Sequence, residues 1–436
     1  MKSEENRVIS ILLIVFFVAL AIGVPVALAI GVSSFIALIL IGDVPLEVLP
    51  QSLYSGINSF PMMTIPFFIL ASDLMSGGRL TQILINFARD LVGHIRGGLG
   101  YGNVIVGLMF SGMSGSALAD AAGPGSIFTR MMRKSGYDPY YAGSLSAAVA
   151  VLGPIIPPSV MMVIYALTDG KTSVSGLFLA GIVPGILLAL SLMVLNFFVS
   201  RKHNYRSHSE RVPFITLLKS FIHSLPAILM PVLIIVGIRG GVVTPTEASA
   251  VAVFYALVVG FFVTKGLTLK NIFGIIVNST IVSCSLLLMI AMGSAFSWVL
   301  TYAQVPQRVA EWMTGLTDNT LVILLLIAFI SLIAGIFLDT LPSLVILVPV
   351  LAPAAYMYGA EPLQVAMVII LTLAIGMLTP PIAPLLFIIS ASGGLRIERL
   401  SIAIIPMIIA EMVVVLLVVF IPEISTGLPN LFGFKN

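Results

Sequence analysis

Long apolar runs dominate the sequence and are separated by short polar or glycine-rich segments. A run of about 20 apolar residues crosses the ~30 Å hydrocarbon core of a membrane as a helix. The runs are continuous rather than alternating, which excludes a transmembrane β-barrel. They predict an all-α polytopic membrane protein with nine spans, at residues 9–42, 60–77, 140–165, 175–200, 222–239, 246–264, 276–302, 362–390 and 402–422.

Two other apolar stretches, 101–129 and 318–356, predict re-entrant hairpins rather than full spans. Basic residues stand on both flanks of the first stretch, with Arg96 before it and Arg130 after it. Since Lys and Arg concentrate in cytoplasmic loops, both flanks are expected on the cytoplasmic side. The glycines and serines of residues 111–116 form a poor helix and a good turn, so we expect the hairpin tip there.

The predicted topology puts the amino terminus in the cytoplasm and the carboxy terminus outside. With nine spans and two hairpins, 17 of the 21 Lys and Arg residues fall in cytoplasmic segments and 4 fall outside. This bias follows the positive-inside rule and supports the topology.

Composition leads to the same class. The chain of 436 residues is 59% hydrophobic and 9% charged, whereas a soluble domain is about 25% charged. A cytosolic enzyme, a nucleic-acid-binding protein and a disordered protein are therefore excluded. The lone Cys284 cannot form an internal disulfide. We expect residues 1–436 to form a single integral membrane unit.

A repeat links the two halves of the sequence. The motif G-x-x-x-P-P occurs at 153–158 and again at 376–381, 223 residues later. Gly112 and Gly335 have the same separation, and both lie near the centre of a predicted hairpin. We therefore predict a first repeat at 9–200, a second at 246–425, and a linking span at 222–239 that turns the second repeat upside down. Inverted repeats with broken helices are typical of secondary transporters.

The proline breaks predict ion and substrate sites. Adjacent prolines remove hydrogen-bond donors and free the carbonyl groups of the preceding turn. In a membrane such carbonyls must face protein, water or an ion, and with Ser or Thr hydroxyls they suit a small cation. The half-helix N-termini at the same breaks favour an anion. Two tip-and-break pairs predict two such sites.

Two acidic residues lie in or near the hairpin tips. Asp339 is at the second tip, where an intramembrane carboxylate is expensive and usually functional. It is also placed to cap the returning half-helix. Asp120 follows the first tip. A structural role for Asp120, in capping a helix or packing against the hairpin arm, fits the sequence as well as contact with an ion does.

Two further acidic residues have structural interpretations. Thr244 and Glu247 have the spacing of a capping box at the start of a span. Glu411, in the middle of a span, is expected to form a hydrogen bond between spans. Segments 79–96 and 302–313 are amphipathic and predict helical arms on the inner and outer faces.

The serines of 111–116 allow two alternatives. Small residues let helices pack closely. Gly112-Met113-Ser114-Gly115 also matches the G-x-S-G pattern of intramembrane serine proteases, but a serine nucleophile needs a base. The four histidines all lie in or beside predicted cytoplasmic segments, which argues against an enzyme.

Three motifs resemble those of the large membrane subunit of tripartite ATP-independent periplasmic (TRAP) transporters. They are Gly112 to Gly123, Thr244-Pro-Thr-Glu-Ala248 and Thr379-Pro-Pro-Ile382. The resemblance covers essentially the whole chain. It implies an elevator-type transporter of the bacterial inner membrane, driven by two or more Na⁺ ions, that imports carboxylate solutes such as sialic acid or C4-dicarboxylates.

The resemblance also implies the site residues. A first Na⁺ site would comprise Ser111, Ser114, Gly153, Ile156 and Pro157. A second Na⁺ site would comprise Gly335, Gly376, Thr379 and Ile382. Substrate contacts would fall at Ser114, Ser159 and Asp339. The chain departs from the family pattern at 383–385, where the family usually has a Gly and often an Asn.

The implied partners are a small membrane subunit of about four spans, a periplasmic substrate-binding protein, the carboxylate solute and lipid. A stand-alone anion symporter, or a proton-coupled one, remains an alternative within transport.

Overall fold

The computed structural model describes residues 2–42, 44–77, 79–205, 211–315, 317 and 319–434. Within these residues the chain is helical and contains no strand. The main helices are α1 (Lys2–Ala21), α2 (Val26–Ile41), α3 (Val48–Ile57), α4 (Thr64–Gly77), α5 (Leu80–Val92), α6 (Gly98–Ser114), α7 (Ala117–Asp120), α8 (Ser126–Lys134), α9 (Pro139–Ala150), α10 (Val160–Asp169), α11 (Val174–Lys202), α12 (Phe214–Arg239), α13 (Pro245–Val258), α14 (Leu269–Tyr302), α15 (Val305–Thr314), α16 (Thr320–Phe337), α17 (Thr340–Met357), α18 (Pro362–Gly376), α19 (Pro384–Gly393), α20 (Ile397–Ala403), α21 (Ile405–Phe420) and α22 (Glu423–Leu431).

Seven helical segments of the described chain are long and apolar enough to cross a membrane. The bent pair α20 and α21, with 44° between its parts, adds an eighth. The predicted all-α polytopic class is confirmed. Both broken spans are also confirmed, because α9 is separated from α10, and α18 from α19, at the two proline motifs.

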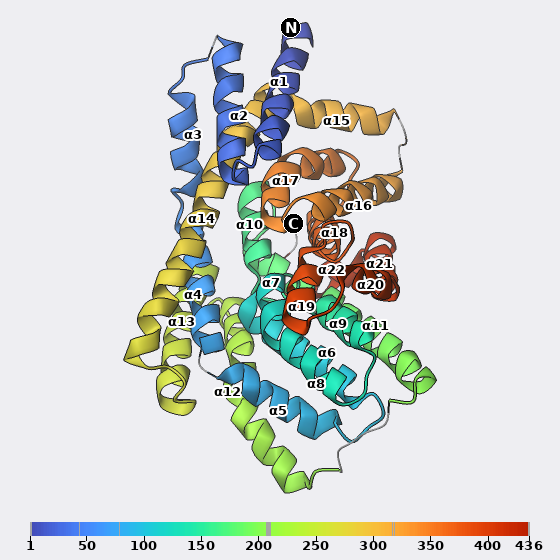
Figure 1. The fold of residues 1–436 in the computed structure, drawn as a ribbon. Helices are drawn as coiled ribbons and strands as arrows, with labels where there is room; N and C mark the ends of the chain where they lie inside the picture. Colours follow the sequence, from blue (N-terminus) through green and yellow to red (C-terminus); the bar gives the residue numbers. More distant parts are fainter. Residues whose placement is uncertain are drawn as a thin grey trace.

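The predicted single span at 9–42 is wrong. Residues 22–25 form a turn, with Gly23 at φ +85° and Pro25 directly before α2. Helices α1 and α2 therefore lie side by side and antiparallel (Figure 1). The turn also contains the apolar residues Ile22 and Val24, so hydropathy does not mark it.

The helix bounds repeat with the offset of 223 residues. Shifted by 223, α6 becomes 321–337, within one residue of α16. The same shift brings α2 onto α13 and α1 onto α12, the helix that the sequence analysis treated as a linking span. The first hairpin extends over 98–134 and is longer than predicted, whereas the second extends over 320–357, close to the predicted 318–356.

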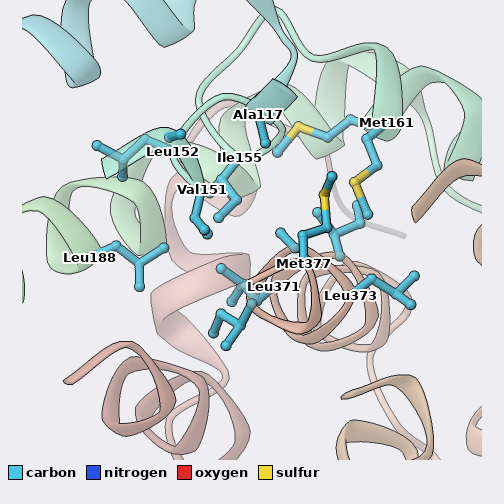
Figure 2. Packing of buried hydrophobic residues seen from close by; sticks show 14 of the residues in the cluster. Ala117, Val151, Leu152, Ile155, Met161, Leu188, Leu371, Leu373 and Met377 are labelled. Carbon is cyan, nitrogen blue, oxygen red and sulfur yellow. The ribbon is translucent and has the colours of Figure 1, made fainter. Parts of the chain in front are cut away.

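The helices form two groups. Figure 1 shows α14 running beside α3, α4 and α13 on one side of the molecule, with the hairpins and broken spans on the other. Helix α18 lies in the interior, since every residue from Leu363 to Gly376 is buried. Figure 2 shows Val151 and Ile155, from the first break, directed toward Leu371 of α18. The two broken spans thus pack against each other.

The two halves are also tied together by polar contacts that we call the two clamps. In one, the Tyr356 hydroxyl at the end of α17 donates to Asp169 Oδ1 at the end of α10 (2.7 Å). In the other, Arg133 near the end of α8 donates to the carbonyl oxygen of Gly393 at the end of α19. Tyr356 and Arg133 are 223 residues apart, so the clamps occupy equivalent positions in the two halves.

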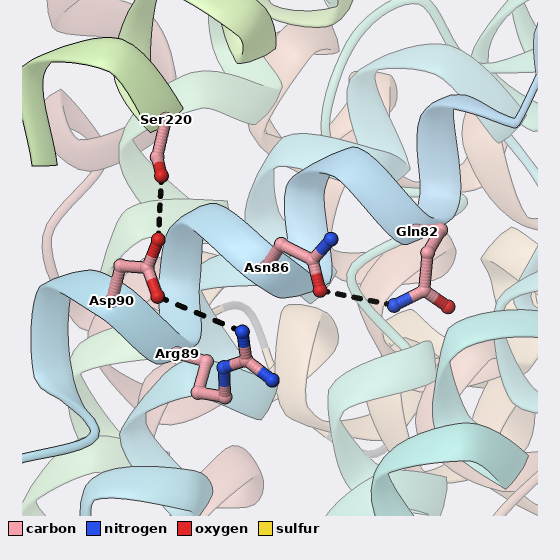
Figure 3. A network of polar contacts seen from close by, with 5 residues as sticks. All are labelled: Gln82, Asn86, Arg89, Asp90 and Ser220. Carbon is pink, nitrogen blue, oxygen red and sulfur yellow. Dashed lines mark hydrogen bonds and ion pairs between the residues drawn. The ribbon is translucent and has the colours of Figure 1, made fainter. Parts of the chain in front are cut away.

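The amphipathic arm predicted at 79–96 is helix α5, and its counterpart is α15. Figure 1 places α5 and α15 at opposite ends of the molecule. Helix α5 packs on both α6 and α12. Figure 3 shows Asp90 of α5 accepting a hydrogen bond from Ser220 of α12, so this arm is joined to the first hairpin and to the α12 side.

Candidate functional site

Each hairpin tip lies against the proline break of its own half. The first hairpin turns at Gly115 and Ser116, and Gly115 has φ +61°. A Cβ on Gly115 would lie 3.0 Å from the carbonyl oxygen of Pro158. In the second half, a Cβ on Gly376 would lie 2.6 Å from the Cα of Gly335. Such close approach of two backbones requires glycine.

The first hairpin holds three side chains that we call the first polar cluster: Ser111, Ser114 and Asp120. Ser111 Oγ donates to Asp120 Oδ2 at 3.0 Å, and Ser114 donates to the other carboxylate oxygen. Asp120 is only 2% exposed. A Cβ on Gly153 would lie 2.9 Å from Asp120 Oδ2. The structure thus brings together three residues of the predicted first Na⁺ site and adds a carboxylate that this site did not include.

The other two residues of that predicted site come from the first break. The carbonyl oxygen of Pro157 faces Gly112, at 3.5 Å from the position of a Cβ there. The side chain of Ile156 packs against Gly185 of α11. An isoleucine side chain has no ligand atom, so Ile156 has only its backbone carbonyl to offer a cation.

The predicted second Na⁺ site is less polar. Gly335 and Gly376 are in backbone contact. The Thr379 hydroxyl donates to the carbonyl oxygen of Ile375 at 3.0 Å, and Ile382 is 43% exposed. The positions equivalent to the first polar cluster hold Ala334, Phe337 and Ser343. The second half therefore lacks the carboxylate and both tip hydroxyls of the first.

Both hairpin tips line the same cavity, whose volume is about 350 Å³. Ser114 and Asp339 face this cavity. Asp339 also accepts a hydrogen bond from the Thr340 N–H at 2.8 Å and so caps α17. The third predicted substrate residue, Ser159, is fully buried outside the lining, where its hydroxyl donates to the carbonyl oxygen of Pro154 at 2.6 Å.

Helices α4 and α14 form the other wall of the cavity, and sequence reasoning missed their contribution. Ser72 and Asp73 of α4 line it, together with Val282 and Leu286 of α14. Asp73 accepts a hydrogen bond from Ser279 of α14 at 2.5 Å. The sequence does carry a signal for Asp73, because an acidic residue inside a predicted membrane span is usually functional.

Two acidic residues outside the cavity had structural predictions. The capping box of Thr244 and Glu247 is confirmed, with the Thr244 N–H donating to Glu247 Oε2 at 2.7 Å. The expected hydrogen bond of Glu411 between spans is wrong. Glu411 is fully buried in α21, and neither of its carboxylate oxygens has a hydrogen-bond partner among the described residues.

Comparison with known proteins identifies the family. The model of the family described as "Tripartite ATP-independent periplasmic transporter, DctM component" matches residues 13–424. The chain belongs to the DctM family. The resemblance seen in the sequence motifs is therefore confirmed.

Curated relatives of this DctM protein are similar along their length. The sialic acid TRAP transporter large permease protein SiaM of Vibrio cholerae is 38% identical over 413 residues, 94% of this chain and 96% of that protein. The 2,3-diketo-L-gulonate TRAP transporter large permease protein YiaN of Escherichia coli is 31% identical over 405 residues, 93% of this chain and 95% of that protein. These relatives are transport permeases, which gives the protease alternative no support.

A solved structure shares the fold. The YdaH transporter of Alcanivorax borkumensis, described as having an unusual topology, matches this DctM protein with a TM-score of 0.66 at 14% identity. The match covers 89% of this chain and 90% of that one.

Proposed function

We propose that this DctM protein is the large membrane component of a sodium-driven importer of an organic carboxylate. The observation that carries the proposal is the meeting of both hairpin tips, each packed on a proline break, at a cavity walled on its other side by α4 and α14. Secondary transporters built from inverted repeats bind their solute at such breaks. The relatives named for sialic acid and 2,3-diketo-L-gulonate support an organic acid as the solute.

The oxygen atoms of the first polar cluster support coupling to Na⁺, and the repeat of the tip and break in the second half supports a second ion. The first polar cluster offers one carboxylate and two hydroxyls beside the carbonyl of Pro157, and hard cations prefer oxygen ligands. In the second half, Gly335, Gly376, Thr379 and Ile382 would supply neutral oxygens. Ser114 and Asp339 would contact the solute, and Ser159 would act behind the cavity wall by fixing Pro154.

The two clamps support an elevator mechanism. Each clamp joins the returning helix of one hairpin to the broken span of the other half. The hairpins and broken spans would then move as one block against α4 and α14, and expose the cavity to one side of the membrane at a time.

The antiparallel pair α1 and α2 changes the proposed topology. Two passes in place of one put the amino terminus outside, on the same side as the carboxy terminus, if the rest of the predicted topology holds. Moving Lys2 and Arg7 to the outside leaves 15 basic residues in cytoplasmic segments and 6 outside. The positive-inside bias is kept, and the protein would lie in the bacterial inner membrane.

Longer relatives support a small membrane subunit as a partner. The chain covers 68% of the sialic acid TRAP transporter permease protein SiaT of Haemophilus influenzae and 64% of the isethionate TRAP transporter permease protein DctMQ of Oleidesulfovibrio alaskensis. We propose that the extra length of such proteins is the counterpart of a separate small subunit of about four spans, and that a periplasmic binding protein delivers the solute.

Reconstitution tests this assembly. Proteoliposomes containing the chain alone, the chain with the small subunit, and both with the binding protein are compared for uptake down a sodium gradient. Uptake that needs all three components supports the proposal. Efficient sodium-driven uptake by the chain alone would favour a stand-alone symporter instead.

A further inference from the structure

The cavity has two walls that come from different parts of the fold. One wall is built from the hairpin tips and carries Ser114, Ser116 and Asp339. The other wall is α4 with α14, and its polar groups are Ser72 and Asp73. In the proposed elevator mechanism the first wall moves and the second stays. A solute that touches both walls is therefore selected by the side chains of both.

The charges of the lining are all negative. Asp73 and Asp339 both line the cavity, and none of the described lining residues is Lys, Arg or His. Two carboxylates repel an anionic solute group placed beside them. In the proposed function, Na⁺ bound at the hairpin tips would offset the charge of Asp339 and attract the solute carboxylate there, whereas no ion is proposed beside Asp73. We therefore place the solute carboxylate at the tips and its other end against α4.

Asp73 is held in place and still able to accept hydrogen bonds. One of its oxygens accepts from Ser279, and no described basic residue forms an ion pair with it. A carboxylate has about four acceptor positions, so one hydroxyl partner leaves most of them open. A hydroxyl group of a solute would form a charge-assisted hydrogen bond there.

We propose that Asp73 is a specificity-determining residue that selects a monocarboxylate with hydroxyl groups at its far end over a dicarboxylate. This inference rests on the proposed function, because it takes the cavity as the solute site. A polyhydroxy acid places donors against Asp73, whereas a dicarboxylate places a second anion there. A site that hydrogen-bonds a hydroxyl strongly rejects analogues that lack it.

Cysteine protection in the full chain tests the proposal without requiring transport. In a Cys284→Ser background, Ser72→Cys reports on the cavity through its rate of labelling by a maleimide in sodium buffer. Gluconate, a polyhydroxy monocarboxylate, should slow labelling, and succinate, a dicarboxylate, should not. Adding Asp73→Asn should weaken protection by gluconate about tenfold, as expected for the loss of one hydrogen bond to a charged group, and should strengthen protection by succinate.

Asp90→Asn is the matched control. Asp90 also accepts a hydrogen bond from a serine of a neighbouring helix, Ser220, but it is not among the residues that line the cavity. Its substitution should therefore leave protection by gluconate and by succinate unchanged. Val282→Cys, on α14, is a second reporter if Ser72→Cys or its double variant does not fold. Equal protection by both solutes, protection by neither, or gluconate protection unaffected by Asp73→Asn would overturn the proposal. If the complete assembly shows no sodium-driven uptake, the proposed function is rejected. A solute protection pattern that depends on Asp73 would still stand in that case.

Discussion

Asp120 is the residue on which the proposed first sodium site depends most. It accepts hydrogen bonds from Ser111 and Ser114 in a buried place where a cation would offset its charge. Asp120→Asn keeps the shape and removes the charge. We expect the sodium concentration for half-maximal uptake to rise about tenfold or more, since charged interactions of this kind are worth roughly 1.5–3 kcal/mol.

The control for this variant is Asp138→Asn. Asp138 caps α9 by accepting from the Tyr141 N–H at 2.8 Å, and asparagine is an equally good cap. Its sodium dependence should match the unaltered protein. A normal sodium dependence in Asp120→Asn would remove Asp120 from the ion site.

At the residue scale, the sequence predicted the pairing of each tip with a proline break and missed part of the chemistry. Gly153 and Gly376 could be found because their motif recurs and only glycine allows such packing. The role of Asp120 could not be separated from capping, because both interpretations fit an acid just after a tip. Asp73 was missed because it lies on α4, away from the tips and breaks at which the repeat predicts the sites.

At the element scale, the clamp between α17 and α10 is open to a matched test. Tyr356→Phe removes the hydroxyl that donates to Asp169 and should cost about 1 kcal/mol. Amide exchange at the ends of α10 and α17 should then become about fivefold faster, measured by hydrogen–deuterium exchange.

The control lies two residues away. Tyr358 is also at the end of α17, but its hydroxyl donates to the carbonyl oxygen of Ala310 in α15. Tyr358→Phe should leave α10 unchanged. Unaltered exchange of α10 in Tyr356→Phe would show that the clamp does not hold the two elements together.

Elements interrupted by proline pairs or glycine-serine turns were predictable, whereas the turn between α1 and α2 was not. A hydropathy window sees one run from 9 to 42, because apolar residues continue through the turn. Only the left-handed Gly23 and the following Pro25 mark the reversal, and the same residue types also occur inside helices of this chain.

At the scale of the whole molecule, the α1–α2 pair predicts an external amino terminus. With Cys284 replaced, Ser3→Cys should react in intact cells with a maleimide that cannot cross membranes. Lys202→Cys, at the end of α11, should react only after the cells are permeabilised. Ser3→Cys that is protected until permeabilisation would restore the cytoplasmic amino terminus.

The central claim for the whole molecule is that solute and sodium cross together, with more sodium charge than solute charge. Solute-dependent current across proteoliposomes holding the complete assembly tests it most directly. We predict an inward positive current that rises more steeply than a hyperbola with sodium concentration and disappears when choline replaces sodium. Uptake that continues unchanged in choline, with or without a proton gradient, would contradict the account.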